Sequence, residues 1–198
     1  MSPRNYRSDK RTAAAEETRL RVLTAARTLL SGASTTQVSV DAVAKAADVS
    51  RQTVYNAFGS KSGLLEALFD SIASQSGMDL QPAFTAPDLT TALDHFSEAF
   101  CVFWASDPLV IRRLHGMAVL DRVLDRLLRD RNEMRRSALV SLLERFGAGT
   151  GPDTVDMIWQ LTSFETYDSL TGADASRDTA QAARLIAAAA VAFHERTA

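Results

Sequence analysis

The side chains best suited to chemistry in this chain lie on a short polar segment. Arg51, Gln52, Thr53 and Asn56 place hydrogen-bond donors and acceptors near the start of an expected helix. Arginine pairs with guanine, glutamine pairs with adenine, and a threonine methyl group contacts the methyl group of thymine. These residue types therefore predict a helix that contacts base edges in the major groove of DNA. A solvated polar face without a partner is the alternative interpretation.

The surrounding sequence predicts the helices that would position this segment. Apolar residues at helical spacing indicate a first helix over about residues 12–31. Two short helices follow, separated at Asp48 and Val49, and a fourth begins near Lys61. A long helix in front of two short ones forms a helix-turn-helix pattern. The expected caps and stops are Gly32, Ser39, Ser50, Gly59 and Ser60.

Charge is distributed unevenly along the chain. Residues 1–61 carry ten Lys and Arg against five Asp and Glu, a net charge of +5, whereas the remainder carries 12 against 19, a net charge of −7. A basic module joined to an acidic one suits a polyanionic partner at one end, although chance clustering gives the same numbers. Four cations precede the first helix as an arm that we expect to be disordered: Arg4, Arg7, Lys10 and Arg11. This arm either lies along DNA phosphates or in a minor groove, or is a solvated tail.

The rest of the chain also predicts helices, and no segment shows a sustained period of two. A linker is expected over residues 76–87, marked by glycine and proline. Beyond it we expect helices over about residues 89–105, 108–116, 119–146, 152–170 and 178–196. The predicted fold is all-α, with an N-terminal helix-turn-helix three-helix module and a C-terminal helical bundle for ligand binding and dimerisation. The predicted domain limits are 1–14 for the arm, 15–60 for the DNA-binding module and 61–198 for the bundle.

Two segments of the C-terminal part carry their own hypotheses. The last helix, expected over about residues 178–196, carries the run Leu185–Phe193, is apolar almost all round and must be buried on most faces. A second subunit would bury it, and a monomer core is the alternative. The polar run from Arg129 to Arg136 is interpreted as the solvated face of a long helix.

Catalytic and metal-binding patterns are missing from the sequence. The histidines at 95, 115 and 194 lack metal-ligand spacing, and there is no HExxH motif or glycine-rich phosphate loop. Cys101 is the single cysteine, so no internal disulfide forms, and a buried apolar role is expected for it rather than a thiol sensor. We therefore predict no enzyme activity, no metal and no cofactor. The first 20 residues lack the apolar core of a signal peptide, so a soluble, cytoplasmic protein is expected.

Residues 38–65, VSVDAVAKAADVSRQTVYNAFGSKSGLL, resemble the DNA-binding domain of TetR-family (tetracycline-repressor-like) transcriptional regulators. The matching residues are Ala26, the Ala47–Ser50 turn, Thr53, Val54, Tyr55, Phe58, Lys61, Leu64 and Leu65. Asp48 stands where the family usually has glycine, and aspartate tolerates the left-handed conformation. Ala57 stands where the family often has a phosphate-contacting His or Tyr. The segment WQLTSFETYDSL, residues 159–170, looks like the penultimate helix of some members, which helps to form the dimer.

This resemblance implies a homodimeric transcriptional regulator, a ligand-responsive repressor that binds an inverted-repeat operator in double-stranded DNA. A ligand-independent regulator or an activator of the same family is the alternative, and a helical scaffold without a DNA role is a third class. The residues expected to contact DNA phosphates are Ser39, Ser50, Tyr55 and Lys61. A small-molecule effector of unknown identity is expected in an apolar pocket. Its candidate residues, each also open to a plain core role, are His95, Phe96, Phe100, Phe103, Trp104, His115, Met117, Trp159, Phe164 and Tyr167.

Overall fold

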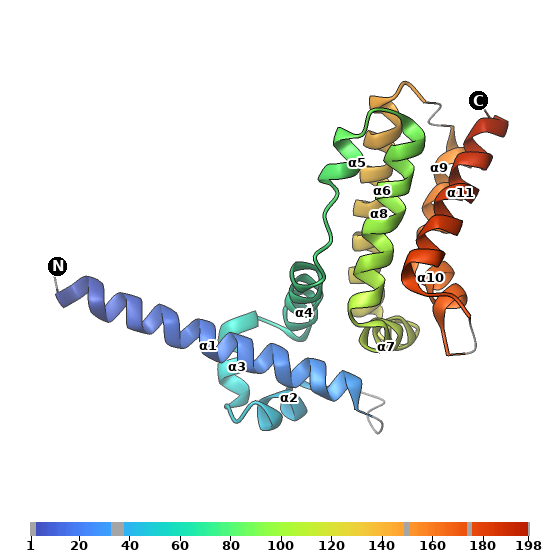
Figure 1. Ribbon diagram of the computed structural model, residues 1–198. Coiled ribbons are helices and arrows are strands. Elements are labelled where there is room, and N and C mark those ends of the chain that lie inside the picture. The colour runs from blue at the N-terminus through green and yellow to red at the C-terminus, as the bar shows by residue number, and fades with distance from the viewer. Residues whose placement is uncertain (1–2, 33–37, 149–150, 174–175, 198) are drawn as a thin grey trace. The chain divides into compact units, whose positions relative to one another are not determined.

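The computed structural model describes residues 3–32, 38–148, 151–173 and 176–197, and every regular element in these ranges is a helix. The all-α prediction is confirmed. The helices, labelled in Figure 1, are α1 (Pro3–Ser31), α2 (Val40–Ala46), α3 (Arg51–Phe58), α4 (Lys61–Gln75), α5 (Gln81–Thr85), α6 (Leu89–Ser106), α7 (Pro108–Ala118), α8 (Arg122–Arg145), α9 (Pro152–Leu161), α10 (Phe164–Thr171) and α11 (Thr179–Thr197).

The chain divides into two compact units. Unit 1 comprises Met1–Ser71 and Leu109–Leu127, and unit 2 comprises Ile72–Pro108 and Leu128–Ala198. Most of α7 and the first residues of α8 therefore pack with α1–α4, although they follow α6 in the sequence. Each unit therefore consists of two separate stretches of the chain. The domain limits predicted from the sequence are continuous ranges, and they remain predictions.

The first helix is longer than expected. It begins at Pro3, not near residue 12, so the residues assigned to a disordered arm lie on helical backbone and that expectation was wrong. Proline suits the first position of a helix, and no glycine or further proline interrupts the segment up to Gly32. Of the four arm cations, only the side chain of Lys10 lies within the described part, where it is exposed.

The helix-turn-helix is built as the sequence predicts. Ser39 caps α2 by accepting a hydrogen bond from the Ala42 N–H at 3.1 Å, and Ser60 accepts one from the Gly63 N–H at 3.0 Å. Asp48 adopts the left-handed φ of 52° in the turn between α2 and α3. The three helices α1, α2 and α3 contact one another, as Figure 1 shows. The fully buried side chains of their shared core include Val22, Ala26, Val43 and Val54.

Unit 2 is organised around α6, which packs against α5 and α11. The short helix α5 lies inside the segment predicted to be a linker, and Pro82 stands near its start, where the ring is tolerated. The single helix predicted over residues 152–170 is two helices. Thr162 ends α9, and Ser163 begins α10 by accepting a hydrogen bond from the Thr166 N–H at 3.2 Å.

The last helix is buried on one face only. Its buried side chains are Ala182, Ala183, Ile186, Ala187 and Ala190, and the helix contacts α6 and α9. Leu185 on the opposite face is 43% exposed. One chain therefore buries about half of this helix, and an apolar residue on the other face stays open to a partner. No helix in the described ranges has the length and apolar character needed to cross a membrane.

Candidate nucleic-acid interface

The polar face of α3 is exposed and its other face is anchored. Arg51, Gln52 and Asn56 are exposed, and Thr53 is partly exposed. Val54, on the opposite face, is 1% exposed and fixes the rotation of the helix. The residues predicted to contact base edges are therefore brought together on one accessible helix face.

Two of these side chains are already paired. Gln52 Nε2 donates a hydrogen bond to Asn56 Oδ1 at 2.9 Å, one helical turn away. This bond leaves the Gln52 carbonyl oxygen and the Asn56 amide N–H groups available to a base edge. A bidentate contact with adenine needs one acceptor and one donor, which this pair offers in a fixed geometry.

Ser50 caps the helix from its N-terminal end. Its Oγ accepts a hydrogen bond from the Thr53 N–H at 3.0 Å and lies 2.8 Å from Thr53 Oγ1. The capping role is therefore present, and the exposed N-terminus of α3 also suits a phosphate. The phosphate contacts predicted for Ser50 and for the exposed Ser39 remain predictions.

Arg51 and Tyr55 form a connected pair with a residue from α2. Arg51 Nη2 donates to the Tyr55 hydroxyl oxygen at 3.2 Å, and Arg51 Nη1 lies 3.2 Å from Asp41 Oδ2. The hydrogen bond to Tyr55 and the charge of Asp41 raise the pKa of Arg51. Asp41 could not be singled out from the sequence, because nothing in the helical pattern indicates that it faces the next helix.

Lys61 has a protein partner where a phosphate was expected. Its ammonium group lies 2.6 Å from Asp121 Oδ2, and both residues belong to unit 1. The hydrogen bond from Lys61 lowers the pKa of Asp121. Asp121 also caps α8, since its Oδ1 accepts from the Val123 N–H at 3.1 Å. A phosphate that contacts Lys61 must therefore compete with a carboxylate.

Removing this competition should strengthen DNA binding. We expect Asp121→Asn to keep the cap, because asparagine caps well, and to release the Lys61 charge. Affinity for any duplex should rise about threefold, and the dependence of log K on log salt should steepen by about one phosphate contact. Fluorescence anisotropy at several salt concentrations measures both quantities. Lys61→Met removes the cation itself and should lower the affinity and flatten its salt dependence. Equal behaviour of the two variants would contradict a phosphate contact by Lys61.

The basic N-terminal segment gives a second expectation. Deleting residues 1–11 should weaken duplex binding and flatten its salt dependence, because Arg4, Arg7, Lys10 and Arg11 would no longer release counterions from DNA. The same anisotropy titration tests it. Unchanged affinity and slope would identify the segment as a solvated helix end.

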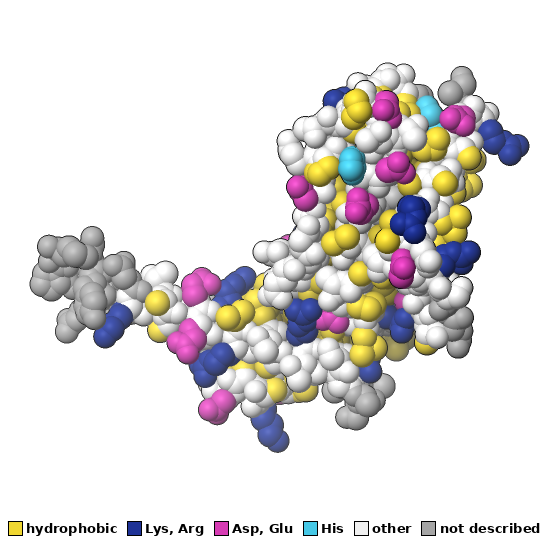
Figure 2. All heavy atoms as spheres, in the orientation of Figure 1, with side chains coloured by type: hydrophobic (Ala, Val, Ile, Leu, Met, Phe, Trp, Pro, Cys, Tyr) yellow, Lys and Arg dark blue, Asp and Glu magenta, His cyan; other side chains and the backbone are white. Residues whose placement is uncertain are grey.

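On the face shown in Figure 2, acidic side chains are interspersed with basic ones along α1, so this face is not a continuous basic patch.

Residues 22–68 match the family model described as "Bacterial regulatory proteins, tetR family", and this range holds α2, α3 and about half of α4. This segment of the chain is therefore similar to the DNA-binding segment of tetR-family regulators. It is 36% identical over 103 residues to the HTH-type transcriptional regulator AlkX of Mycobacterium tuberculosis, a match that covers 50% of this chain. The match spans 48% of AlkX, about half of its length.

Solved structures of tetR-family proteins share the fold over nearly the whole chain. A regulator from Marinobacter aquaeolei VT8 superposes with a TM-score of 0.63 at 20% identity, covering 90% of this chain and 97% of that one. One from Streptomyces coelicolor gives 0.61 at 22% identity, covering 92% and 84%. RolR in complex with resorcinol gives 0.53 at 21% identity, covering 92% and 89%. At these identities the likeness concerns the fold.

The predicted effector residues divide between the two units. Six aromatic side chains of unit 2 are buried and packed: Phe96, Phe100, Phe103, Trp104, Phe164 and Tyr167. The Phe103 and Trp104 ring centroids are 4.6 Å apart, and those of Trp104 and Phe164 are 5.6 Å apart. His95 and Trp159 in unit 2 are partly exposed, whereas His115 and Met117 lie on α7 in unit 1. The buried six form a core cluster, and their role in effector binding remains a prediction.

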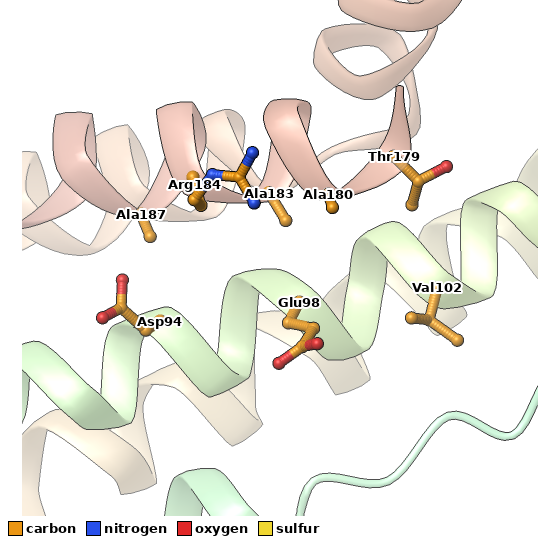
Figure 3. Close-up of a pocket in the computed structure, with 8 residues that line it drawn as sticks. All are labelled: Asp94, Glu98, Val102, Thr179, Ala180, Ala183, Arg184 and Ala187. Atoms are coloured by element: carbon orange, nitrogen blue, oxygen red, sulfur yellow. The ribbon is translucent and has the colours of Figure 1, made fainter. Parts of the chain in front are cut away.

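A groove in unit 2 has a different lining. It runs between α6 and α11 and has a volume of about 400 Å³. Figure 3 shows Asp94, Glu98 and Val102 on α6, and Arg184 with three alanines on α11. None of the predicted pocket residues lines it.

Cys101 on α6 is buried, and burial raises the pKa of its thiol to about 12, which fits the apolar role expected for it.

Arg135 is a buried cation that the sequence did not reveal. Residues 129–136 were expected to be solvated, but Arg135 is 4% exposed, so for this residue the expectation was wrong. Its Nη1 donates to the Trp159 carbonyl oxygen and, at 2.7 Å, to Thr162 Oγ1. Burial lowers the pKa of Arg135 to about 10, so it stays charged at neutral pH. The guanidinium thus binds the Trp159 carbonyl in the last turn of α9, where a cation suits the helix dipole.

Proposed function

We propose that this protein is a DNA-binding transcriptional regulator, a ligand-responsive repressor that binds an inverted repeat as a homodimer in the cytoplasm. The observation that carries the proposal is the exposed polar face of α3, on which Arg51, Gln52 and Asn56 point outward while Val54 anchors the helix. A face with paired donors and acceptors on a helix-turn-helix suits base contacts in the major groove. A ligand-independent regulator or an activator of the same family is the alternative.

The dimer proposal rests on the open faces of α9 and α11. Met157 and Leu185 are each 43% exposed, and α11 adds exposed alanines at 188 and 192. Small residues let two helices approach closely, and the exposed apolar side chains would be removed from water in the contact between two copies. Two copies joined in this way would present two α3 helices to half-sites roughly 34–36 Å apart, or a multiple of this distance.

The effector proposal rests on the fold and on the aromatic content of unit 2. A relative with this fold, RolR, was crystallised with resorcinol, a small aromatic compound. The ten predicted residues include aromatic side chains that would contact such a molecule. An effector that binds one conformation of the dimer more tightly would shift the population towards it and change DNA affinity by the coupling free energy.

Selection of the purified protein from a random duplex library at moderate salt tests the proposal. We expect enrichment of an inverted repeat, and sedimentation of the complex at the mass of two chains per duplex. A single non-repeated half-site with one chain bound would overturn the dimer. No enrichment at any salt concentration, together with no shift of bulk DNA, would overturn the DNA-binding role.

A further inference from the structure

The contact between α2 and α3 assigns a role to Asp41, which lies outside the set of expected DNA-contacting residues. We propose that Asp41 is a specificity-determining residue that holds the Arg51 guanidinium in position to recognise guanine. This inference rests on the proposed DNA-binding function. Asp41 itself acts through Arg51 and is a positioning residue.

The Arg51 guanidinium is held at both terminal nitrogens. Asp41 Oδ2 accepts from Nη1 at 3.2 Å, and the Tyr55 hydroxyl oxygen accepts from Nη2 at 3.2 Å. The guanidinium carbon also lies 5.5 Å from the centre of the Tyr55 ring. Asp41 is ten residues before Arg51 on the preceding helix, so its carboxylate fixes the arginine relative to the whole helix-turn-helix.

Both charged side chains face solvent while they hold each other. The Arg51 side chain is 59% exposed and the Asp41 side chain 65% exposed. Solvent screening makes such a pair a weak contributor to folding stability. Its more significant effect is on conformation, because a long arginine side chain otherwise loses rotamer freedom when it binds.

The remaining hydrogen-bond donors match one base. Each terminal nitrogen of arginine carries two N–H groups, and Asp41 and Tyr55 take one from each. One N–H therefore remains on Nη1 and one on Nη2, which together form a two-donor fork. Guanine presents two acceptors, O6 and N7, on its major-groove edge, whereas adenine presents one acceptor beside an amino donor. A fixed fork therefore favours guanine, and a mobile one discriminates less.

Asp41 also carries a cost that separates this role from general attraction to DNA. A carboxylate close to the phosphate backbone repels it and lowers affinity for every sequence. Such a charge is useful where it increases the difference in affinity between the operator sequence and other DNA sequences. Removing Asp41 should therefore increase affinity for unrelated duplexes while it decreases discrimination.

The test compares Asp41→Ala with a matched control, Asp48→Asn. Asp48 lies on the same helix-turn-helix, and its substitution removes the same charge; asparagine also tolerates the φ of 52°. The probes are the duplex enriched by the wild-type protein and the same duplex with each guanine replaced in turn, with pairing kept. Dissociation constants are measured at several salt concentrations, and circular dichroism melting checks that each variant folds.

We expect the wild type to prefer guanine at one position per half-site by at least about 10-fold, and Arg51→Ala to abolish that preference. Asp41→Ala should reduce it to about threefold or less, while Asp48→Asn should leave it unchanged. Both variants should bind unrelated duplexes slightly more tightly. In the Arg51→Ala background, Asp41→Ala should change no base preference further.

Preserved or increased guanine preference in Asp41→Ala would overturn the positioning role. An enriched duplex without a guanine that depends on Arg51 would overturn it as well, while the proposed DNA-binding function would stand. Failure of the wild type to enrich any duplex would instead overturn the proposed function, and the inference with it.

Discussion

Gln52→Ala should lower affinity for the selected duplex by about 100-fold, because each of two half-sites would lose one base contact. The hydrogen bond of 2.9 Å between Gln52 and Asn56 makes the loss larger than that of one amide, since Asn56 would lose its orienting partner as well. Affinity for unrelated duplexes should change less than about twofold, because no phosphate contact is removed. Competition titrations with selected and unrelated duplexes measure both effects.

Tyr55→Phe serves as the matched comparison for Gln52→Ala. The Tyr55 hydroxyl is expected to contact a phosphate, so its removal should weaken binding to all duplexes by a similar factor. The hydroxyl also accepts from Arg51 Nη2, so a small loss of guanine preference should accompany the uniform loss. If Gln52→Ala weakened all duplexes equally while Tyr55→Phe changed the preferred sequence, the two roles would have to be exchanged.

Arg135→Ala should lower the free energy of unfolding by about 3 kcal/mol. The substitution leaves the Trp159 carbonyl oxygen without its guanidinium donor and empties the space between the Phe100 and Trp159 rings, whose centroids lie 5.7 Å and 5.2 Å from the guanidinium carbon. Urea denaturation followed by circular dichroism at 222 nm measures the change.

Arg136→Ala is the control for Arg135→Ala. Arg136 is the next residue, and it bonds to the exposed Asp156 at 2.8 Å. Surface ion pairs contribute less than about 1 kcal/mol, so the two neighbouring arginines should differ clearly. Equal losses for both variants would show that the buried contacts of Arg135 do not stabilise the junction between α9 and α10.

The helix-turn-helix could be predicted from the sequence because its signals are local. Ser39, Ser50 and Ser60 each lie three residues before the N–H that they cap, and Asp48 tolerates the left-handed turn. The polar face of α3 followed from the same spacing. These features depend on residues within one helical turn, so no knowledge of tertiary packing is needed.

The features that the sequence did not reveal depend on packing between distant segments. The break after Thr162 contains no glycine or proline, and the apolar spacing continues across it, so periodicity predicted one helix. Arg135 lies in a run of charged residues, and only its contact with α9 shows that it is buried. The pairs Arg51–Asp41 and Lys61–Asp121 join residues ten and 60 positions apart, which helical spacing does not bring together.

The two tryptophans of this chain lie beside the Arg135 junction. Trp104 Nε1 donates to the Thr162 carbonyl oxygen at 3.1 Å, and Trp159 Nε1 donates to the Asn132 carbonyl oxygen at 3.1 Å. Unit 1, which carries α3, contains no tryptophan. Tryptophan fluorescence of the unlabelled protein, excited selectively over tyrosine, is therefore a reporter of unit 2 alone. A change in tryptophan emission when operator DNA is added would show that DNA binding at α3 changes the surroundings of the tryptophans in unit 2. The same emission can be followed while an effector is titrated.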